Sequence, residues 1–82
     1  MYGVLFSDTA RKDLDNLPQS YQRLIFNRLI TLASDPRPRG SKKLEAQTYR
    51  VRQGPYRVLY EVHDYGREVL VLKIKARREG YR

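Results

Sequence analysis

The sequence predicts an α+β fold in which an N-terminal strand and a two-helix hairpin pack on one face of a small, twisted, mainly antiparallel sheet. Side chains over residues 49–75 alternate between two faces with the period of two that strands have. Apolar side chains over residues 8–34 recur instead every three or four positions, which is the helical period. At 82 residues the chain can build one modest core, so we expect a single domain over residues 1–82.

The apolar run Tyr2–Ser7 is a strand candidate that we expect to join the sheet as an extra strand. Ser7 or Asp8 can cap a first helix, because its side-chain oxygen can accept a free backbone N–H of the first turn. This helix should end before Pro18, since proline disfavours a helix interior. Its inward face would consist of Ala10, Leu14 and Leu17.

A second helix is predicted from Pro18 to about Ser34, because proline is suited to the first turn of a helix. We interpret its apolar stripe as core packing against the apolar face of the sheet. That stripe consists of Tyr21, Leu24, Ile25, Leu29, Leu32 and Ala33.

The segment Asp35–Lys43 is predicted to be a loop, because two prolines and a glycine disfavour regular structure. Its basic side chains are Arg37, Arg39, Lys42 and Lys43. The loop is either a solvated connector or an arm that contacts phosphate groups, and the sequence leaves both interpretations open.

Turn chemistry predicts how the three C-terminal strands pair. A two-residue turn at Gly54-Pro55 suits a primed hairpin, and it would place Arg52 opposite Arg57.

The second turn is predicted to be a three-residue loop at residues 64–66, with its glycine in the left-handed position. In an antiparallel pair the numbers of the partners keep a constant sum. Tyr60 would therefore face Leu70, and Arg57 would face Lys73, with no bulge between these two strands.

These registers divide the sheet into two unlike faces. The apolar face would carry Tyr49, Val51, Tyr56, Val58, Tyr60, Leu70, Leu72 and Ile74. The cationic face would carry Arg50, Arg52, Arg57, Lys73, Lys75 and, if the last strand runs that far, Arg77. Three apolar residues would share the cationic face: Leu59, Val69 and Val71.

The net charge of +8 falls entirely in the second half of the chain. Residues 1–35 contain four basic and four acidic side chains, whereas residues 36–82 contain 13 basic and 5 acidic ones. A basic surface kept for solubility alone would not separate charge by half and by face. We therefore expect a polyanionic partner.

Several classes of protein are disfavoured. The chain has no cysteine, which excludes disulfides and thiolate chemistry. No apolar run approaches the roughly 20 residues of a membrane span, and nothing resembles a signal peptide, so we expect a soluble cytoplasmic protein. Phosphate-loop, metal-spaced and nucleophile-elbow motifs are missing. The single histidine, His63, falls near a turn, where a surface position without a role is the simpler interpretation.

RNA is the polyanion that this pattern favours. Guanidinium groups bind phosphate bidentately, and the tyrosine of the C-terminal tail could stack on an unpaired base. Neither predicted helix carries a cluster of side chains suited to reading a DNA groove.

The segment YRVRQGPYRVLYEV, followed by VLVLKIKARREGYR, resembles the RelE/ParE toxin superfamily and its RelE branch in particular. The order of strand, helix hairpin, basic loop and three-stranded meander is similar too, so the resemblance covers essentially the whole chain. It implies a type II toxin–antitoxin toxin: an mRNA interferase that binds RNA at the ribosome and inhibits translation. It also implies a cognate antitoxin as partner and no metal or other cofactor.

RelE-like toxins cut mRNA in the ribosomal A site through attack of a ribose 2′-OH on the adjacent phosphate. The resemblance implies that Arg57 and Arg78 contact the phosphate and that Tyr81 stacks on or orients the nucleotide. The catalytic candidates are Arg52, Arg57, Arg78 and Tyr81. The RNA-binding candidates are Arg50, Lys42, Lys43, Lys73, Lys75 and Arg77.

The chain departs from the RelE pattern at Arg50 and Arg52, where lysines are frequent in that family. Arginine stays charged, so Arg52 is a poor general base. Other candidate bases are Glu45, Glu61 and His63; alternatively the ribosome supplies part of the chemistry, or the activity is weak. Two other functions stay open, namely a ParE-like inhibitor of DNA gyrase and a non-catalytic RNA-binding protein.

Overall fold

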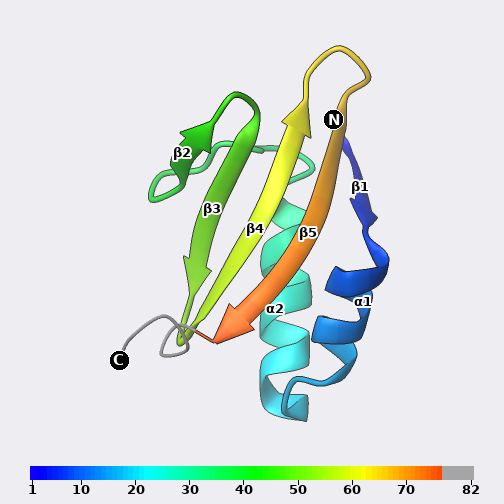
Figure 1. Cartoon of the computed structure of the whole chain (residues 1–82), viewed down its shortest axis with the longest axis vertical. Coiled ribbons are helices and arrows are strands. Elements are labelled where there is room, and N and C mark those ends of the chain that lie inside the picture. The colour runs from blue at the N-terminus through cyan, green and yellow to red at the C-terminus, as the bar shows by residue number, and fades with distance from the viewer. Residues whose placement is uncertain (77–82) are drawn as a thin grey trace.

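The computed structural model describes residues 1–76, which form five strands and two helices (Figure 1). In chain order these elements are β1 (Gly3–Phe6), α1 (Asp8–Asp15), α2 (Gln19–Thr31), β2 (Lys42–Glu45), β3 (Thr48–Gln53), β4 (Tyr56–His63) and β5 (Glu68–Ala76). The strands form one sheet in the order β1-β5-β4-β3-β2. The first strand runs parallel to β5 and the other neighbours are antiparallel, which confirms the predicted α+β fold and its extra N-terminal strand.

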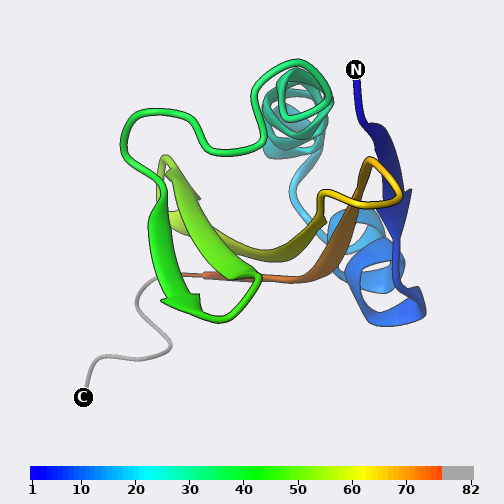
Figure 2. The same cartoon turned by 90° about the horizontal axis from the view of Figure 1, so that it is seen from above.

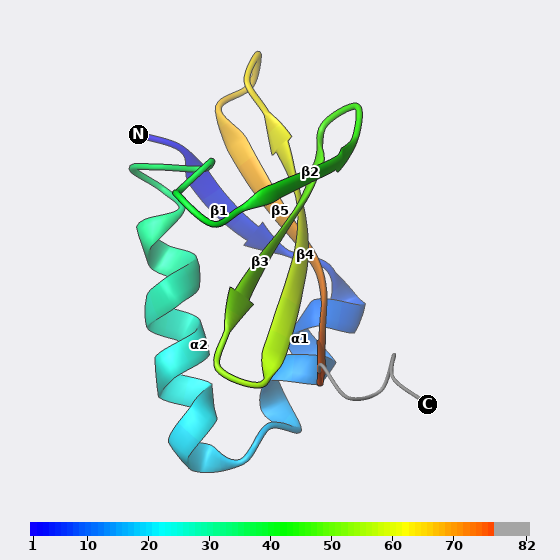
Figure 3. The ribbon, with the colours of Figure 1, turned by 90° about the vertical axis from the view of Figure 1, so that its left-hand side faces the viewer.

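The sheet curves around α2, as Figure 2 shows, and α2 runs along one face of the strands (Figure 3). The core lies between them and is built from apolar side chains that are almost fully buried. It consists of Ala10, Ile25, Leu29, Leu32, Tyr49, Val51, Val58, Tyr60, Val62, Val69, Val71 and Ile74. Among residues 1–76, no helix has the length and apolar content that crossing a membrane requires.

Side chains near the two ends of α1 hold this first helix against β5 through hydrogen bonds. Ser7 is the N-cap, and its Oγ accepts the N–H of Ala10 at 3.0 Å, as predicted. The same hydroxyl donates to the carbonyl of Leu72 at 2.8 Å. Near the other end of the helix, a carboxylate oxygen of Asp13 accepts the N–H of Ile74 at 2.9 Å. These two hydrogen bonds satisfy backbone groups of β5 beyond residue 71, where its pairing with β1 ends.

The second helix ends at Thr31, and residues 32–34 form a turn instead of the predicted last helical residues. Ile25, Leu29 and Leu32 are fully buried, but Leu24 is half exposed and does not belong to the core. Leu24 is about 100° around the helix from Ile25, so the two side chains cannot face the sheet equally.

The prediction of a loop over Asp35–Lys43 is wrong at its last two residues, because Lys42 and Lys43 begin an additional strand, β2. Lys42 pairs with Arg50 on β3, and the hairpin closes with Ala46 at a φ of 34°. All four residues of β2 are exposed, so the strand has no apolar alternation for the sequence to reveal. Backbone pairing with the edge of β3 defines it instead.

The predicted register between β3 and β4 is confirmed, with Arg52 opposite Arg57. The predicted register between β4 and β5 is wrong. The loop has four residues, 64–67, and it is Arg67, at a φ of 56°, that takes the left-handed conformation. His63 consequently pairs with Glu68.

A β-bulge then shifts the register a second time. Tyr60 pairs with Val71, whereas Leu59 pairs with Lys73, so Leu72 has no partner on β4. Because the loop is one residue longer than predicted, Val69 and Val71 are fully buried, and Leu70 and Leu72 are not. The bulge returns Ile74 to the core. Arg57 therefore faces Lys75 and not Lys73.

Candidate nucleic-acid interface

Two rows of side chains cross the face of the sheet that is turned away from α2. The first row follows β3, β4 and β5 and consists of Arg52, Arg57 and Lys75. The second row follows β2, β3, β4 and β5 and consists of Lys42, Arg50, Leu59 and Lys73. Neighbouring strands lie about 4.8 Å apart, so the cations within each row are close neighbours.

Like charges directly opposite each other destabilise a sheet. The pairs Arg52–Arg57 and Arg57–Lys75 are both of this kind. An anion bound across the row would offset the repulsion. A row of cations on one face of a sheet is typical of a surface that binds an anion.

The two rows enclose a cavity of about 190 Å³. It is lined by Arg50, Arg57, Leu59, Lys73 and Lys75. Leu59 separates Arg50 from Lys73 in the second row and contributes the apolar part of the lining. A phosphate group held here would meet cations from three strands, and charge-assisted hydrogen bonds to a phosphate are stronger than those between neutral groups.

The structure brings together only part of the predicted site. Arg52 and Lys42 share the cationic face but do not line the cavity. Lys43 pairs with Tyr49, whose side chain is in the core, so it is directed away from the cationic face. Arg77, Arg78 and Tyr81 lie outside the described residues.

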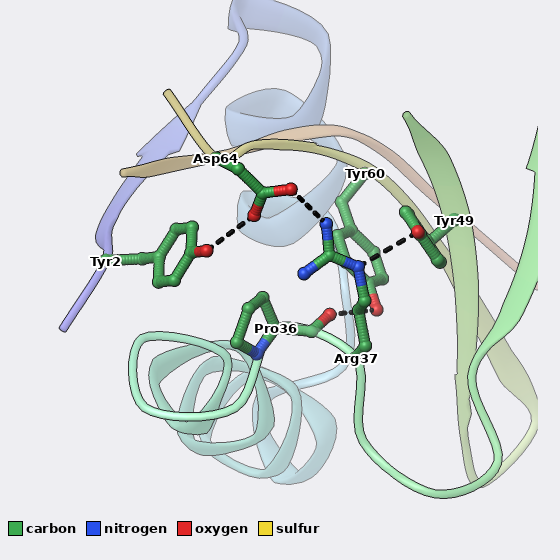
Figure 4. Close-up of polar contacts among 6 residues, drawn as sticks. All are labelled: Tyr2, Pro36, Arg37, Tyr49, Tyr60 and Asp64. Carbon is green, nitrogen blue, oxygen red and sulfur yellow. Dashed lines mark hydrogen bonds and ion pairs between the residues drawn. The ribbon is translucent and has the colours of Figure 1, made fainter. Parts of the chain in front are cut away.

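A polar cluster at one end of the sheet involves Arg37, which comes from the basic loop (Figure 4). Its Nη2 donates to Asp64 at 2.6 Å and its Nε donates to the hydroxyl of Tyr49 at 2.9 Å. Tyr2 donates to the other oxygen of Asp64 at 2.5 Å, and Tyr60 donates to the carbonyl of Pro36 at 2.8 Å. The loop is thus fastened to Tyr49 on β3, to Tyr60 on β4 and to Asp64 just after β4, and Arg37 serves as a structural link instead of a phosphate contact.

The charges in this cluster hold each other ionised. Hydrogen bonding to Arg37, and secondly to Tyr2, lowers the pKa of Asp64 below its ordinary value of 3.8. Hydrogen bonding to Asp64 and Tyr49 raises the pKa of Arg37 further above its ordinary value. Burial raises the pKa of Tyr60, whose hydroxyl stays neutral as the donor to Pro36.

Replacing Asp64 by Asn is expected to reduce the sensitivity of the fold to acid. Because the pKa of Asp64 is lower in the folded chain than in the unfolded one, its contribution to stability is complete above about pH 4 and is lost as the pH falls through the folded value. The thermal midpoint of the wild type should therefore fall more between pH 7 and pH 3 than that of Asp64→Asn. The effect will be modest, since the side chain is 60% exposed.

Asp35→Asn is the matched control, because the Asp35 side chain has no hydrogen bond or ion pair among the described residues. It should show the acid sensitivity of the wild type. Equal acid sensitivity of Asp64→Asn and the wild type would contradict a stabilising role for the Arg37–Asp64 pair.

Similarity to known proteins covers nearly the whole chain. A family model for the ParE toxin of the type II toxin–antitoxin system parDE matches residues 4–81. Toxin RelG of Mycobacterium tuberculosis is 33% identical over 84 residues, which cover 99% of this chain and 97% of the relative. This chain belongs to the RelE/ParE superfamily of type II toxins.

Solved structures of RelE toxins share its fold. The RelBE2 toxin–antitoxin complex of M. tuberculosis matches with a TM-score of 0.82 at 34% identity, over 93% of this chain and 98% of that one. The archaeal RelE–RelB complex of Pyrococcus horikoshii OT3 matches with a TM-score of 0.85 at 32% identity, over 93% and 94%. The RelE-like architecture expected from the resemblance is confirmed.

In this RelE/ParE toxin, a second polar pair lies on the cationic face beyond the cavity. Glu61 and His63 are neighbours on the outer side of β4, and Nε2 of His63 lies 2.8 Å from a carboxylate oxygen of Glu61. Both residues were candidate bases in the sequence, and their spacing of two places them on one face of the strand. They lie two and four residues from Leu59 and do not line the cavity. Glu45 ends β2 at the exposed edge of the sheet.

A larger hollow of about 390 Å³ lies between the end of α1 and β5. Lys73 and Lys75 line this hollow as well, but no arginine of residues 1–76 does, and the carboxylate of Asp13, which already accepts a backbone N–H, would repel a phosphate. The smaller cationic cavity is therefore the better candidate site for RNA. Within residues 1–76, no three His, Asp or Glu side chains are grouped as metal ligands would be.

Proposed function

We propose that this toxin is a ribosome-dependent mRNA endoribonuclease of the cytoplasm that cuts in the A site and so inhibits translation. The observation that carries the proposal is the cavity in which cations of β3, β4 and β5 converge around Leu59. The scissile phosphate would lie in this cavity. The relatives named RelG and RelE support the same branch of the superfamily.

The proposed reaction uses the RNA's own 2′-OH as nucleophile and leaves a 2′,3′-cyclic phosphate and a 5′-OH. Its transition state gathers negative charge on the phosphate oxygens, and preorganised cations stabilise such charge strongly. Arg57 and Arg50, which line the cavity from neighbouring strands, would bind these oxygens. Arg52 is exposed at the end of the first row, where it would hold the adjoining backbone, and its permanent charge makes it unsuited to remove the 2′-OH proton.

The proposed partners are the ribosome with its mRNA and a cognate antitoxin. The M. tuberculosis and P. horikoshii structures are both toxin–antitoxin complexes, which supports an antitoxin for this chain too. An acidic or amphipathic segment would complement either the cationic rows or the apolar side chains that α2 exposes, namely Leu24, Phe26 and Ile30.

Inhibition of DNA gyrase is the second candidate function, because the family model that matches residues 4–81 is the one named for the ParE toxin. A gyrase inhibitor binds a protein and cuts nothing. It would not need the phosphate-sized, cation-lined cavity, so we rank it second.

Primer extension on a defined mRNA in a purified translation system tests the proposal. The toxin should produce cuts within the A-site codon when ribosomes are present and none when they are omitted. Intact mRNA at saturating toxin would contradict the proposal, and inhibition of gyrase supercoiling by the same preparation would then establish the second candidate. Salt-sensitive RNA binding without cleavage would indicate a non-catalytic RNA-binding protein.

A further inference from the structure

The four-residue loop between β4 and β5, residues 64–67, projects beyond the ends of both strands (Figure 1). It carries Tyr65, whose side chain is fully exposed, and a Cβ placed at the neighbouring Gly66 would meet no atom beyond its chain neighbours within 4 Å. An aromatic ring there contributes no packing to the fold. Single exposed apolar side chains are common on protein surfaces, so exposure alone does not indicate a binding site. The backbone that carries the ring distinguishes this one.

Hydrogen bonds hold this loop on three sides. The N–H of Arg67 donates to the carbonyl of Asp64 at 3.2 Å, and the carbonyl of Arg67 accepts the N–H of Gly3 at 2.9 Å. The carboxylate of Asp64 accepts hydrogen bonds from the basic loop and from the residue before β1 (Figure 4). Tyrosine has few rotatable bonds, so a ring on a braced backbone loses little conformational entropy when it binds. Tyr65 is therefore preorganised for contact with a partner.

A base of RNA is the partner that suits the tip of this loop. Asp64 is neutralised by Arg37, and Arg67 makes no ion pair among residues 1–76, so the loop presents one cation close to one aromatic ring. Unpaired bases stack on tyrosine rings, and arginine binds an adjoining phosphate. Every base has a π-face, so such a contact provides affinity without requiring a particular sequence.

Acidic side chains separate this loop from the cationic cavity. Glu61 and Glu68 lie on the same outer face of the sheet, between Leu59 and the loop. At about 3.3 Å per residue, the end of β4 at His63 is about 13 Å from Leu59. An RNA backbone that followed β4 from the cavity to the loop would pass both carboxylates, which repel phosphate. The RNA that fits against Tyr65 is therefore a different segment from the one in the cavity.

We propose that the loop between β4 and β5 is a second RNA contact, in which the ring of Tyr65 stacks on an unpaired base of ribosomal RNA and Arg67 binds a phosphate beside it. This inference rests on the proposed function, because a toxin that cuts mRNA on the ribosome meets two RNA molecules. The messenger lies in the cavity, and the ribosomal RNA lies against the loop. The loop then contributes to the affinity for the ribosome and does not touch the scissile phosphate.

Single-turnover cleavage of mRNA at increasing ribosome concentration tests this contact. Tyr65→Ala should raise the ribosome concentration that gives half the maximal rate by about 5-fold or more, as expected for the loss of one stacked base. The maximal rate itself should stay at the wild-type value. Tyr65→Phe keeps the ring and should match the wild type in both quantities. Leu24→Ala is the matched control, because it removes a half-exposed side chain from α2, and it should also match the wild type.

An unchanged half-maximal concentration for Tyr65→Ala would overturn the contact. A lower maximal rate would also overturn it, because the loop would then act on the reaction and not on ribosome binding.

A variant with the photoreactive p-azidophenylalanine at position 65 identifies the partner. It is crosslinked to ribosomes whose A-site codon contains 2′-deoxyribose, so that the messenger stays intact. Reverse transcription should then stop at a discrete base of ribosomal RNA. A crosslink to the messenger, a crosslink to ribosomal protein alone, or none at all would overturn this inference. A crosslink to ribosomal RNA by a toxin that leaves ordinary mRNA uncut would instead overturn the proposed function and leave the contact in place.

Discussion

Arg57→Ala is expected to reduce ribosome-dependent mRNA cleavage by about 100-fold or more, which is the usual cost of removing one preorganised group that stabilises transition-state charge. Arg57 is at the centre of the first cationic row, between Arg52 and Lys75, and it lines the cavity. Loss of its guanidinium removes the cation that is best placed to contact two phosphate oxygens at once. Single-turnover cleavage followed by primer extension measures the effect.

Two control variants separate this role from general attraction to RNA. Arg57→Lys keeps the charge but not the bidentate geometry, and it should recover only part of the lost rate. Arg39→Ala removes an exposed arginine of the loop before β2, and it should leave the cleavage rate close to that of the wild type. Circular dichroism would verify that each variant is folded. Cleavage at the wild-type rate by Arg57→Ala would contradict the proposal that the scissile phosphate binds in this cavity.

Val71→Asp is expected to unfold the toxin or to reduce its free energy of unfolding by at least about 3 kcal/mol, because it would bury an unpaired carboxylate. Val71 is fully buried and pairs with Tyr60 in the centre of the sheet. Total stabilities of small proteins are only about 5–15 kcal/mol, so this loss is a large part of the whole. Urea denaturation followed by circular dichroism measures it.

Leu72→Asp is the matched comparison, since it places the same carboxylate one residue along β5. Leu72 is at the bulge, without a partner on β4, and it is only partly buried. The substitution should therefore cost much less than Val71→Asp. The opposite ranking would mean that β5 lacks the bulge and that Leu72 faces the core.

Local sequence features determined the fold class and most elements. Ser7 identified the start of α1 because a side-chain cap needs only the backbone of its own first turn. Gly54-Pro55 set the register between β3 and β4 because a two-residue turn fixes the pairing of the strands that it joins. The cations of β3 and β4 were assigned correctly to one face for the same reason.

Other features depended on contacts between segments far apart in the chain. The sequence does not show the strand β2, because its four exposed residues are held by pairing with β3 and not by burial. The sequence does not distinguish Arg37 from the other cations of the basic loop. Its structural role depends on Asp64, which is 27 residues away in sequence and whose carboxylate lies 2.6 Å from the Arg37 guanidinium in the fold.

The most consequential of these features is the register of β5. Apolar residues occupy every position from 69 to 72, so burying Val69 and Val71 or burying Leu70 and Leu72 would satisfy the alternation equally well. Contacts with β1 and with Ser7 on one side, and with β4 on the other, selected the first arrangement and placed the bulge at Leu72. The sequence by itself therefore determined that this toxin has a cationic sheet face. The tertiary structure decided which lysine of that face stands beside Leu59, because a single unpaired residue reverses the direction of every side chain after it.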